Sequence, residues 1–224
     1  MSSSRKIPDL SSIRGFILDL DGVVWRADQP IGDLPRVFEI FRDQGWKVAL
    51  ATNNATLSPD LYVQKFAGFG VEVERWQVVN SAQAAAHYLH GQFPEGGPVF
   101  ILGETGLIEA LEEQSFFHAD DQVLAVVVGM DRQLTYDKLS QAALLIRAGA
   151  LFVGTNPDRT FPMPFGLVPG AGAILAALET ATDIKPFIAG KPAQEMYKVA
   201  LERLGLAPGE TLVVGDRLET DIAG

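Results

Sequence analysis

Apolar and polar positions fall in blocks along the chain, and four apolar blocks are followed at once by polar residues. The first block, 16–18, contains no polar position, which is typical of a strand buried on both faces of a parallel sheet. Similar blocks occupy 46–51, 186–189 and 211–214. The pattern therefore predicts four buried strands, each ending in residues that can carry chemistry.

Between these strands, apolar residues recur with helical spacing. One such stretch begins at Leu34 and ends at Gly45, and Ser58 with Pro59 begins another that runs to about residue 68. A further helix, 193–204, precedes the last strand. The order strand, helix, strand, helix predicts an α/β fold with a doubly wound parallel sheet, similar to a Rossmann sheet.

The pattern changes near residue 83. Strand-like runs alternate there with helical ones, and Pro and Gly cluster at 157–172. The strand-like runs are 98–102, 123–129 and 151–154, and the helical ones are 105–114, 135–148 and 171–181. We interpret 84–184 as an inserted α/β domain, and 1–83 with 185–224 as the two parts of the core.

Composition narrows the classes of partner. The chain of 224 residues has a net charge of -10, which argues against nucleic acid and anionic membranes. It contains no cysteine, so thiolate metal sites and disulfides are excluded. No apolar run approaches a membrane span, and 1–6 lack the apolar core of a signal peptide. We expect a cytoplasmic protein.

The residues after the four strands form one set. The carboxyl ends of parallel strands lie at the same edge of a sheet, where open α/β folds bind ligands. Carboxylates suit Mg²⁺, while ammonium and hydroxyl groups suit phosphate oxygens. In chain order the set is Asp19 and Asp21, Thr52 and Asn53, Lys191, and Asp216 and Asp221. Each residue alone is equally compatible with an ordinary turn.

Asp19 and Asp21 are two residues apart, so on an ideal strand both carboxylates point to the same side. Two carboxylates held so close repel each other. They are tolerated if a cation lies between them or if one of them stays protonated. The pair is therefore compatible with a cation site, with one protonated carboxyl group, or with two ordinary turn aspartates.

The motifs DLDGVVW, TNN, GKP and GDRLETDI, in this order, resemble those of haloacid dehalogenase (HAD) superfamily phosphatases. The segment GTNPDRTFP to PGAG, 154–172, resembles the cap of subfamily IIA, whose C2-type cap lies between the second and third motifs. Its members include 4-nitrophenyl phosphatases, phosphoglycolate phosphatases and NagD-like proteins. The resemblance covers nearly the whole chain after the N-terminal tail.

This resemblance implies a Mg²⁺-dependent phosphatase of small phosphorylated metabolites. Candidate substrates are 4-nitrophenyl phosphate, phosphoglycolate and sugar-phosphate-like esters. Asp19 would be the nucleophile that forms an aspartyl-phosphate, and Asp21 the general acid and then the base. Thr52 and the backbone of Asn53 would hold the phosphate, and Lys191 would neutralise its charge.

The resemblance also implies the metal ligands. Asp19, Asp216 and the backbone carbonyl of Asp21 would bind Mg²⁺, and Asp221 would act through water or steady the site. In the cap loop, Asn156, Asp158 and Arg159 would contact the variable part of the substrate; equally, Asn156 and Asp158 could only shape a turn. Relatives often form homodimers through the cap.

Two rival functions stay open. A phosphomutase uses the same scaffold, although such relatives usually carry the cap elsewhere. A non-catalytic binding or regulatory protein would not need Asp21, which is also absent from family dehalogenases and replaced by threonine in ion-pumping ATPases. Asp21 therefore favours a phosphatase.

The last strand carries a further expectation. The run 211–214 is apolar and β-branched, without the charges or proline that protect a sheet edge. Relatives continue for a few tens of residues after it. We expect that these 224 residues are a truncated form of a longer chain, or that another element covers this edge.

Overall fold

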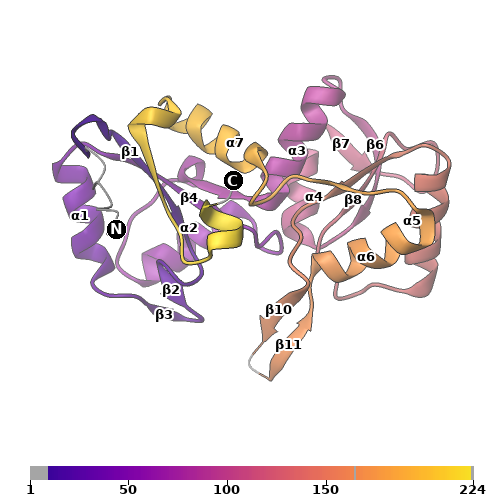
Figure 1. Ribbon diagram of the computed structural model, residues 1–224, viewed down its shortest axis with the longest axis horizontal. Coiled ribbons are helices and arrows are strands. Elements are labelled where there is room, and N and C mark those ends of the chain that lie inside the picture. Colours follow the sequence, from indigo (N-terminus) through magenta and orange to yellow (C-terminus); the bar gives the residue numbers. More distant parts are fainter. Residues whose placement is uncertain (1–9, 164, 223–224) are drawn as a thin grey trace, which may run out of the picture.

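A computed structural model describes residues 10–163 and 165–222. Its first sheet has the order β13-β1-β4-β5 and is parallel throughout (Figure 1). The strands are β1 (Gly15–Asp19), β4 (Lys47–Thr52), β5 (Val78–Asn80) and β13 (Thr211–Val214). The parallel sheet with β1, β4 and β13 was predicted, and β13 lies at its edge as expected, but β5 was not predicted. Residues 1–9, where we expected no signal peptide, and 223–224 lie outside the described part.

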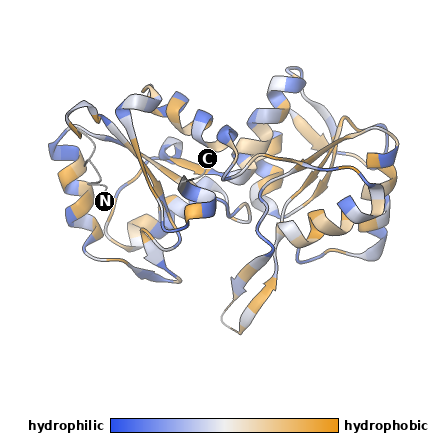
Figure 2. Cartoon of the chain, viewed as in Figure 1, coloured by the Kyte–Doolittle hydropathy of each residue, from blue (hydrophilic) through white to orange (hydrophobic). Residues whose placement is uncertain are grey.

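Helices cover both faces of this sheet. Side chains of α1 (Leu34–Asp43) and α2 (Pro59–Gly68) share one apolar cluster with β1 and β4. Side chains of α3 (Ser81–Gln92) and α7 (Gln194–Leu204) belong to a second cluster that includes Ile17 of β1. In Figure 2, α1 shows hydrophobic and hydrophilic bands, as expected of a helix with one buried face.

A second parallel sheet has the order β12-β9-β8-β6-β7. Its strands are β6 (Gly97–Leu102), β7 (Phe116–His118), β8 (Ala125–Val128), β9 (Leu151–Gly154) and β12 (Phe187–Ile188). Its helices are α4 (Thr105–Glu112), α5 (Tyr136–Arg147) and α6 (Ala171–Thr182). Side chains of α5 and α6 pack on one face of this sheet, and α4 packs on the other together with α3.

Two antiparallel hairpins extend from the layers. β10 (Thr160–Met163) pairs with β11 (Gly166–Pro169), and this hairpin projects from the molecule (Figure 1). β2 (Trp25–Arg26) pairs with β3 (Gln29–Pro30), between β1 and α1. The β10–β11 hairpin lies in the Pro- and Gly-rich segment and was not predicted.

One predicted strand belongs to the other sheet. The run 186–189 was assigned to the core, but β12 pairs with β9, with Phe187 opposite Val153. A half-buried strand of two residues carries too little pattern to identify its neighbour. The predicted domain boundaries stay predictions: the first, 83/84, falls inside α3, and the second sheet continues to Ile188, beyond residue 184.

Helix α3 joins the two sheets. Its alanines and Leu89 are almost fully buried, in one cluster with Ile17 of β1 and Val153 of β9. Because alanine side chains are small, the helices α4 and α7 can both pack closely against α3. The edges of the two sheets are thereby held in a fixed relation. None of the helices in the described ranges has the length and hydropathy needed to cross a membrane.

Candidate active site

Asp19 is the last residue of β1 and lies between the neighbouring strands. Its backbone pairs with Ala51 of β4, and its side chain is buried, with 8% of the residue exposed. The apolar residues Ile17 and Leu18 place β1 inside the sheet, so the strand delivers this carboxylate into the interior. A carboxylate in such a place needs a cationic partner.

That partner is Lys191, which is only 3% exposed. Its Nζ contacts Asp19 Oδ1, donates to Asp221 Oδ1 at 2.6 Å and to the Ala51 carbonyl at 3.3 Å. Lys191 reaches the site from the loop after β12, and not from a core strand as predicted. One buried ammonium group thus joins two buried carboxylates.

The charge balance leaves room for a further cation. Burial raises the pKa of Asp19 to about 6, although Lys191 opposes this rise. The nearby Asp221 carboxylate adds to it. A single lysine therefore does not fully offset the cost of burying an ionised Asp19.

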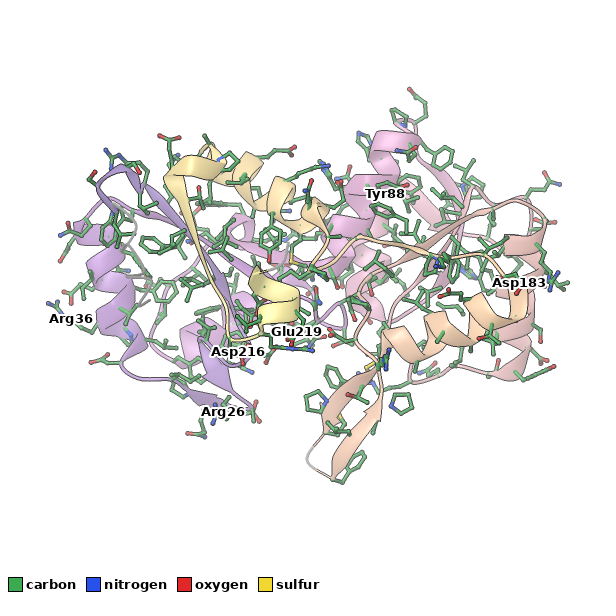
Figure 3. The ribbon with its side chains drawn as sticks, viewed as in Figure 1. Arg26, Arg36, Tyr88, Asp183, Asp216 and Glu219 are labelled. Atoms are coloured by element: carbon green, nitrogen blue, oxygen red, sulfur yellow. The ribbon has the colours of Figure 1, made fainter. Side chains whose placement is uncertain are left out.

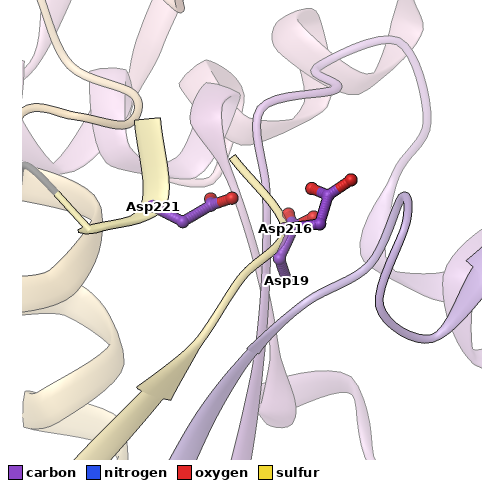
Figure 4. Close-up of side chains that lie close together, drawn as sticks. All are labelled: Asp19, Asp216 and Asp221. Atoms are coloured by element: carbon purple, nitrogen blue, oxygen red, sulfur yellow. The ribbon is translucent and has the colours of Figure 1, made fainter. Parts of the chain in front are cut away.

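Asp19, Asp216 and Asp221 each present an oxygen to the same space (Figure 4). One ligand oxygen from each lies within 4.8 Å of the others. Figure 3 shows Asp216 just beyond β13, on the turn that leads to Glu219. Three carboxylates around one space fit a hard divalent cation such as Mg²⁺. The arrangement brings together three of the four predicted metal residues.

Two glycines allow this packing. Gly22 has φ +97°, and a Cβ there would lie 2.1 Å from Asp216 Oδ2. At Gly215, a Cβ would lie 2.1 Å from the Asp221 Cβ. The carboxylates can approach the backbone because these positions carry no side chain.

Asp21 is not a member of this carboxylate group. β1 ends at Asp19, and the chain turns so that Asp21 is exposed. Its Oδ1 accepts a hydrogen bond from Trp25 Nε1 at 2.9 Å. The alternation rule used for the sequence holds only along a continuing strand, so it does not extend to Asp21.

Thr52 and Asn53 follow β4 as predicted. Thr52 is buried, and its Oγ1 accepts from the backbone N–H of Asn54 at 3.2 Å. The Asn53 side chain holds the Lys191 backbone at both polar groups: Oδ1 accepts from its N–H at 2.8 Å, and Nδ2 donates to its carbonyl at 3.0 Å. Asn53 thereby fixes the loop that carries Lys191.

The cap-loop residues behave differently from one another. Asn156 Nδ2 donates to the Asn53 carbonyl at 2.7 Å, and Asp158 Oδ2 accepts from Asn53 Nδ2 at 3.2 Å. Asp158 Oδ1 also accepts from Arg217 Nη1 at 3.2 Å. The backbone carbonyl of Arg159 accepts from the Gly170 N–H at 3.0 Å, but its side chain is exposed and forms no hydrogen bond or ion pair within the described ranges. Of the three, only Arg159 has a side chain free for a substrate.

Sequence reasoning missed three residues of this region. Trp25 contacts Asp21, Arg217 contacts Asp158, and Ser81 Oγ donates to the Asn53 carbonyl at 2.5 Å. Arg217 directly follows Asp216 in the last motif, which was the available signal. Trp25 is the last residue of the first motif, DLDGVVW, which was likewise an available signal. Ser81 begins a helix, and no sequence pattern distinguishes it from an ordinary cap residue.

Comparisons with known proteins show the family to which this chain belongs. The family described as haloacid dehalogenase-like hydrolase matches residues 16–117, and a second HAD-hydrolase-like family matches 188–224. An acid sugar phosphatase of Staphylococcus aureus is 36% identical over 214 residues, which are 95% of this chain and 82% of that protein.

Two solved structures show the same fold. The 4-nitrophenylphosphatase of Thermotoga maritima has a TM-score of 0.89 and 33% identity, covering 96% of this chain and 82% of its own. The glycerol phosphate phosphatase of Mycobacterium tuberculosis, solved in complex with calcium, has a TM-score of 0.87 and 38% identity. The match covers 95% of this chain and 63% of that protein's chain. All three relatives are named as phosphatases.

Proposed function

Because the chain belongs to the haloacid dehalogenase-like hydrolases and is a phosphoric monoester hydrolase of subfamily IIA, we propose a Mg²⁺-dependent reaction through an aspartyl-phosphate on Asp19. One observation supports it above others: Lys191 contacts both Asp19 and Asp221, in the group that also holds Asp216. Such a site neutralises the two anions that must meet in phosphoryl transfer.

The chain's own residues account for each proton and bond. An oxygen of Asp19 forms a bond to phosphorus while the bond to the ester oxygen breaks, and Asp21 gives that oxygen a proton. Asp21 then takes a proton from water, whose oxygen attacks phosphorus and releases Asp19. The products are the free alcohol and inorganic phosphate.

The phosphate is held by groups at two strand ends. Thr52 and the backbone of Asn53 lie at the end of β4, and Lys191 lies beside Asp19. Positioned donors of this kind stabilise the charge on the transferring group. The side chain of Asn53 is already used to hold the Lys191 loop, so its contribution is to position that loop.

The residues present fit a bound Mg²⁺. Asp19, Asp216 and the backbone carbonyl of Asp21 would hold the ion, and Asp221, already bound to Lys191, would steady the site. When bound, the ion supplies Lewis-acid charge stabilisation for the phosphoryl oxygens. The hydroxyl of Tyr197 donates to the Asp221 carbonyl at 2.9 Å and fixes that residue.

The substrate class we propose is small sugar- or polyol-like phosphate esters. It is supported by the relatives named acid sugar phosphatase and glycerol phosphate phosphatase. The exposed Arg159, in the loop between β9 and β10, is available for the part of the ester that varies. Phosphoglycolate and 4-nitrophenyl phosphate are further candidates of the same size.

The test is hydrolysis of 4-nitrophenyl phosphate with Mg²⁺, with excess chelator, and by Asp19→Asn. We expect turnover only in the first case, since an amide oxygen is a poor nucleophile. Rapid quenching should capture an acid-stable phosphoenzyme on Asp19. Near-native turnover by Asp19→Asn would refute the assignment. A phosphate isomer in place of inorganic phosphate would identify a mutase, and binding without turnover a binding protein.

A further inference from the structure

We propose that Trp25 is a positioning residue that fixes the carboxyl group of Asp21 and makes Oδ2 the oxygen that carries the catalytic proton. The inference rests on the proposed function, in which Asp21 is the general acid. The contact behind it is the hydrogen bond from the indole Nε1 of Trp25 to Asp21 Oδ1 at 2.9 Å.

Trp25 is held rigidly by its surroundings. It is 1% exposed and is the largest of the fully buried side chains in the described ranges. Its ring stacks on Tyr62 with a centroid distance of 6.2 Å and is tilted against Phe66 at 5.1 Å and Phe69 at 6.0 Å. Lys65 Nζ lies 4.3 Å from the ring centroid. An indole packed on several sides has one available orientation.

The backbone links the two residues independently. The Gly22 N–H donates to the Trp25 carbonyl at 2.7 Å, and the Trp25 N–H donates to the Leu20 carbonyl at 3.1 Å. This tight turn places Trp25 directly beside Asp21. The distance between indole and carboxyl is therefore set by a rigid loop and a rigid ring together.

Asp21, in contrast, is exposed. An exposed carboxyl group can rotate among several orientations, and fixing it costs side-chain entropy. General acid catalysis needs the proton within hydrogen-bond reach of the leaving oxygen. The buried indole supplies this restraint without closing the acid off from the substrate.

The direction of the hydrogen bond decides where the proton is. An indole N–H can only donate, so Oδ1 must accept. A protonated carboxyl group carries one O–H, and its proton is therefore placed on Oδ2. After proton transfer to the leaving oxygen, the carboxylate keeps the Trp25 bond, and Oδ2 is free to take a proton from water.

The test compares leaving groups of different basicity. Aryl and alkyl phosphates, from 4-nitrophenyl to glycerol phosphate, differ in how much they need the acid. We expect Trp25→Phe to leave kcat/KM for 4-nitrophenyl phosphate within about threefold and to lower it by roughly 10–100-fold for glycerol phosphate, a share of the usual effect of a general acid.

The matched control is Trp46→Phe. Trp46 also packs in an aromatic cluster, with ring centroids 5.2 Å from Phe16 and 6.3 Å from Phe41, and it does not contact Asp21. It should leave the leaving-group dependence unchanged. If Trp25→Phe does not fold, β-(3-benzothienyl)alanine at position 25 keeps the ring size, lacks the N–H, and should give the same dependence.

Asp21→Asn separates this inference from the proposed function. If Asp21→Asn does not steepen the dependence on leaving-group basicity, the assignment of Asp21 as acid fails. If it does, while both Trp25 variants behave like Trp46→Phe, the inference about Trp25 is overturned. In the Asp21→Asn background, Trp25→Phe should not steepen the dependence of kcat/KM on leaving-group basicity any further, since the two residues act through one proton.

Discussion

Two groups of polar side chains meet at the edge of the core sheet, and they are held very differently. Asp19, Lys191 and Asp221 are each at most 8% exposed and bind one another. Arg159 and Arg217, at the rim, are exposed. A buried charge group cannot lose one member without leaving an unpaired charge. In the proposed mechanism, the buried group acts on the phosphate common to all esters, and the rim residues contact the part of the ester that varies.

Lys191→Ala should break the buried group most severely. We expect kcat/KM to fall by about 10²–10³-fold for every ester alike, because in the proposed mechanism the lysine contacts the common phosphate. Stability should also fall by about 3–5 kcal/mol, since two buried carboxylates lose their cation. Kinetics on an ester panel and chemical denaturation measure both effects.

The control for this substitution is Lys198→Ala, on α7, whose side chain is 54% exposed and pairs with Glu195. It should change neither quantity noticeably. A Lys191→Ala enzyme that loses activity on some esters only would contradict the division between the buried group and the rim.

The raised pKa of Asp19 predicts how metal-free stability depends on pH. Because its folded pKa of about 6 exceeds the ordinary aspartate pKa of 3.8, the folded state binds the proton more tightly than the unfolded state does. Proton binding to Asp19 therefore stabilises the folded state by no more than about 3 kcal/mol. This stabilisation is complete below about pH 4 and is lost as the pH rises through about 6. Chemical denaturation with chelator present measures the free energy of unfolding of wild type and of Asp19→Asn at each pH. The difference between the two curves gives the contribution of Asp19. Equal pH profiles for the two proteins would contradict it.

Asp216→Asn should weaken the metal site without disturbing the buried pair. Asp216 is exposed, so its loss leaves Asp19, Lys191 and Asp221 in contact. We expect the Mg²⁺ concentration for half-maximal activity to rise by about 10–100-fold. Glu219→Gln, on the same turn but outside the carboxylate group, is the control. An unchanged Mg²⁺ requirement would remove Asp216 from the ligand set.

Arg159→Ala is expected to have the smallest effect. It should shift the ranking among esters by a few-fold, as is usual for an exposed charge, and leave Mg²⁺ dependence alone. Arg147→Ala, in the last turn of α5, should leave the ranking as it is. If the ranking is the same in both variants, Arg159 does not contribute to specificity.

Sequence pattern predicted the parts of this molecule that depend on local structure. The strands β1 and β4 and the residues that follow them lie where buried runs ending in polar residues indicated. The cluster of Asp19, Asp216 and Asp221 follows from parallel strands ending at one edge. These predictions succeed because apolar runs that end in polar residues constrain the chain strongly.

Contacts between distant segments could not be predicted in the same way. Asn156 and Asp158 bind Asn53 and Arg217, more than fifty residues away, so their position in a cap loop did not show that their side chains are already engaged. β12 is too short to indicate its sheet. Asp21 was placed by a strand rule, whereas a turn and Trp25 determine where it lies.

Helix α3 has a consequence for how the protein unfolds. Its buried alanines belong to one apolar cluster that reaches both sheets, and it packs on α4 and on α7. Unfolding one sheet alone would expose the apolar side chains of this cluster to water. We therefore expect neither sheet to unfold while the other stays folded. Heat or denaturant should unfold both sheets in a single cooperative transition. The candidate active site at the edge of the core sheet should then keep its geometry until the whole chain unfolds.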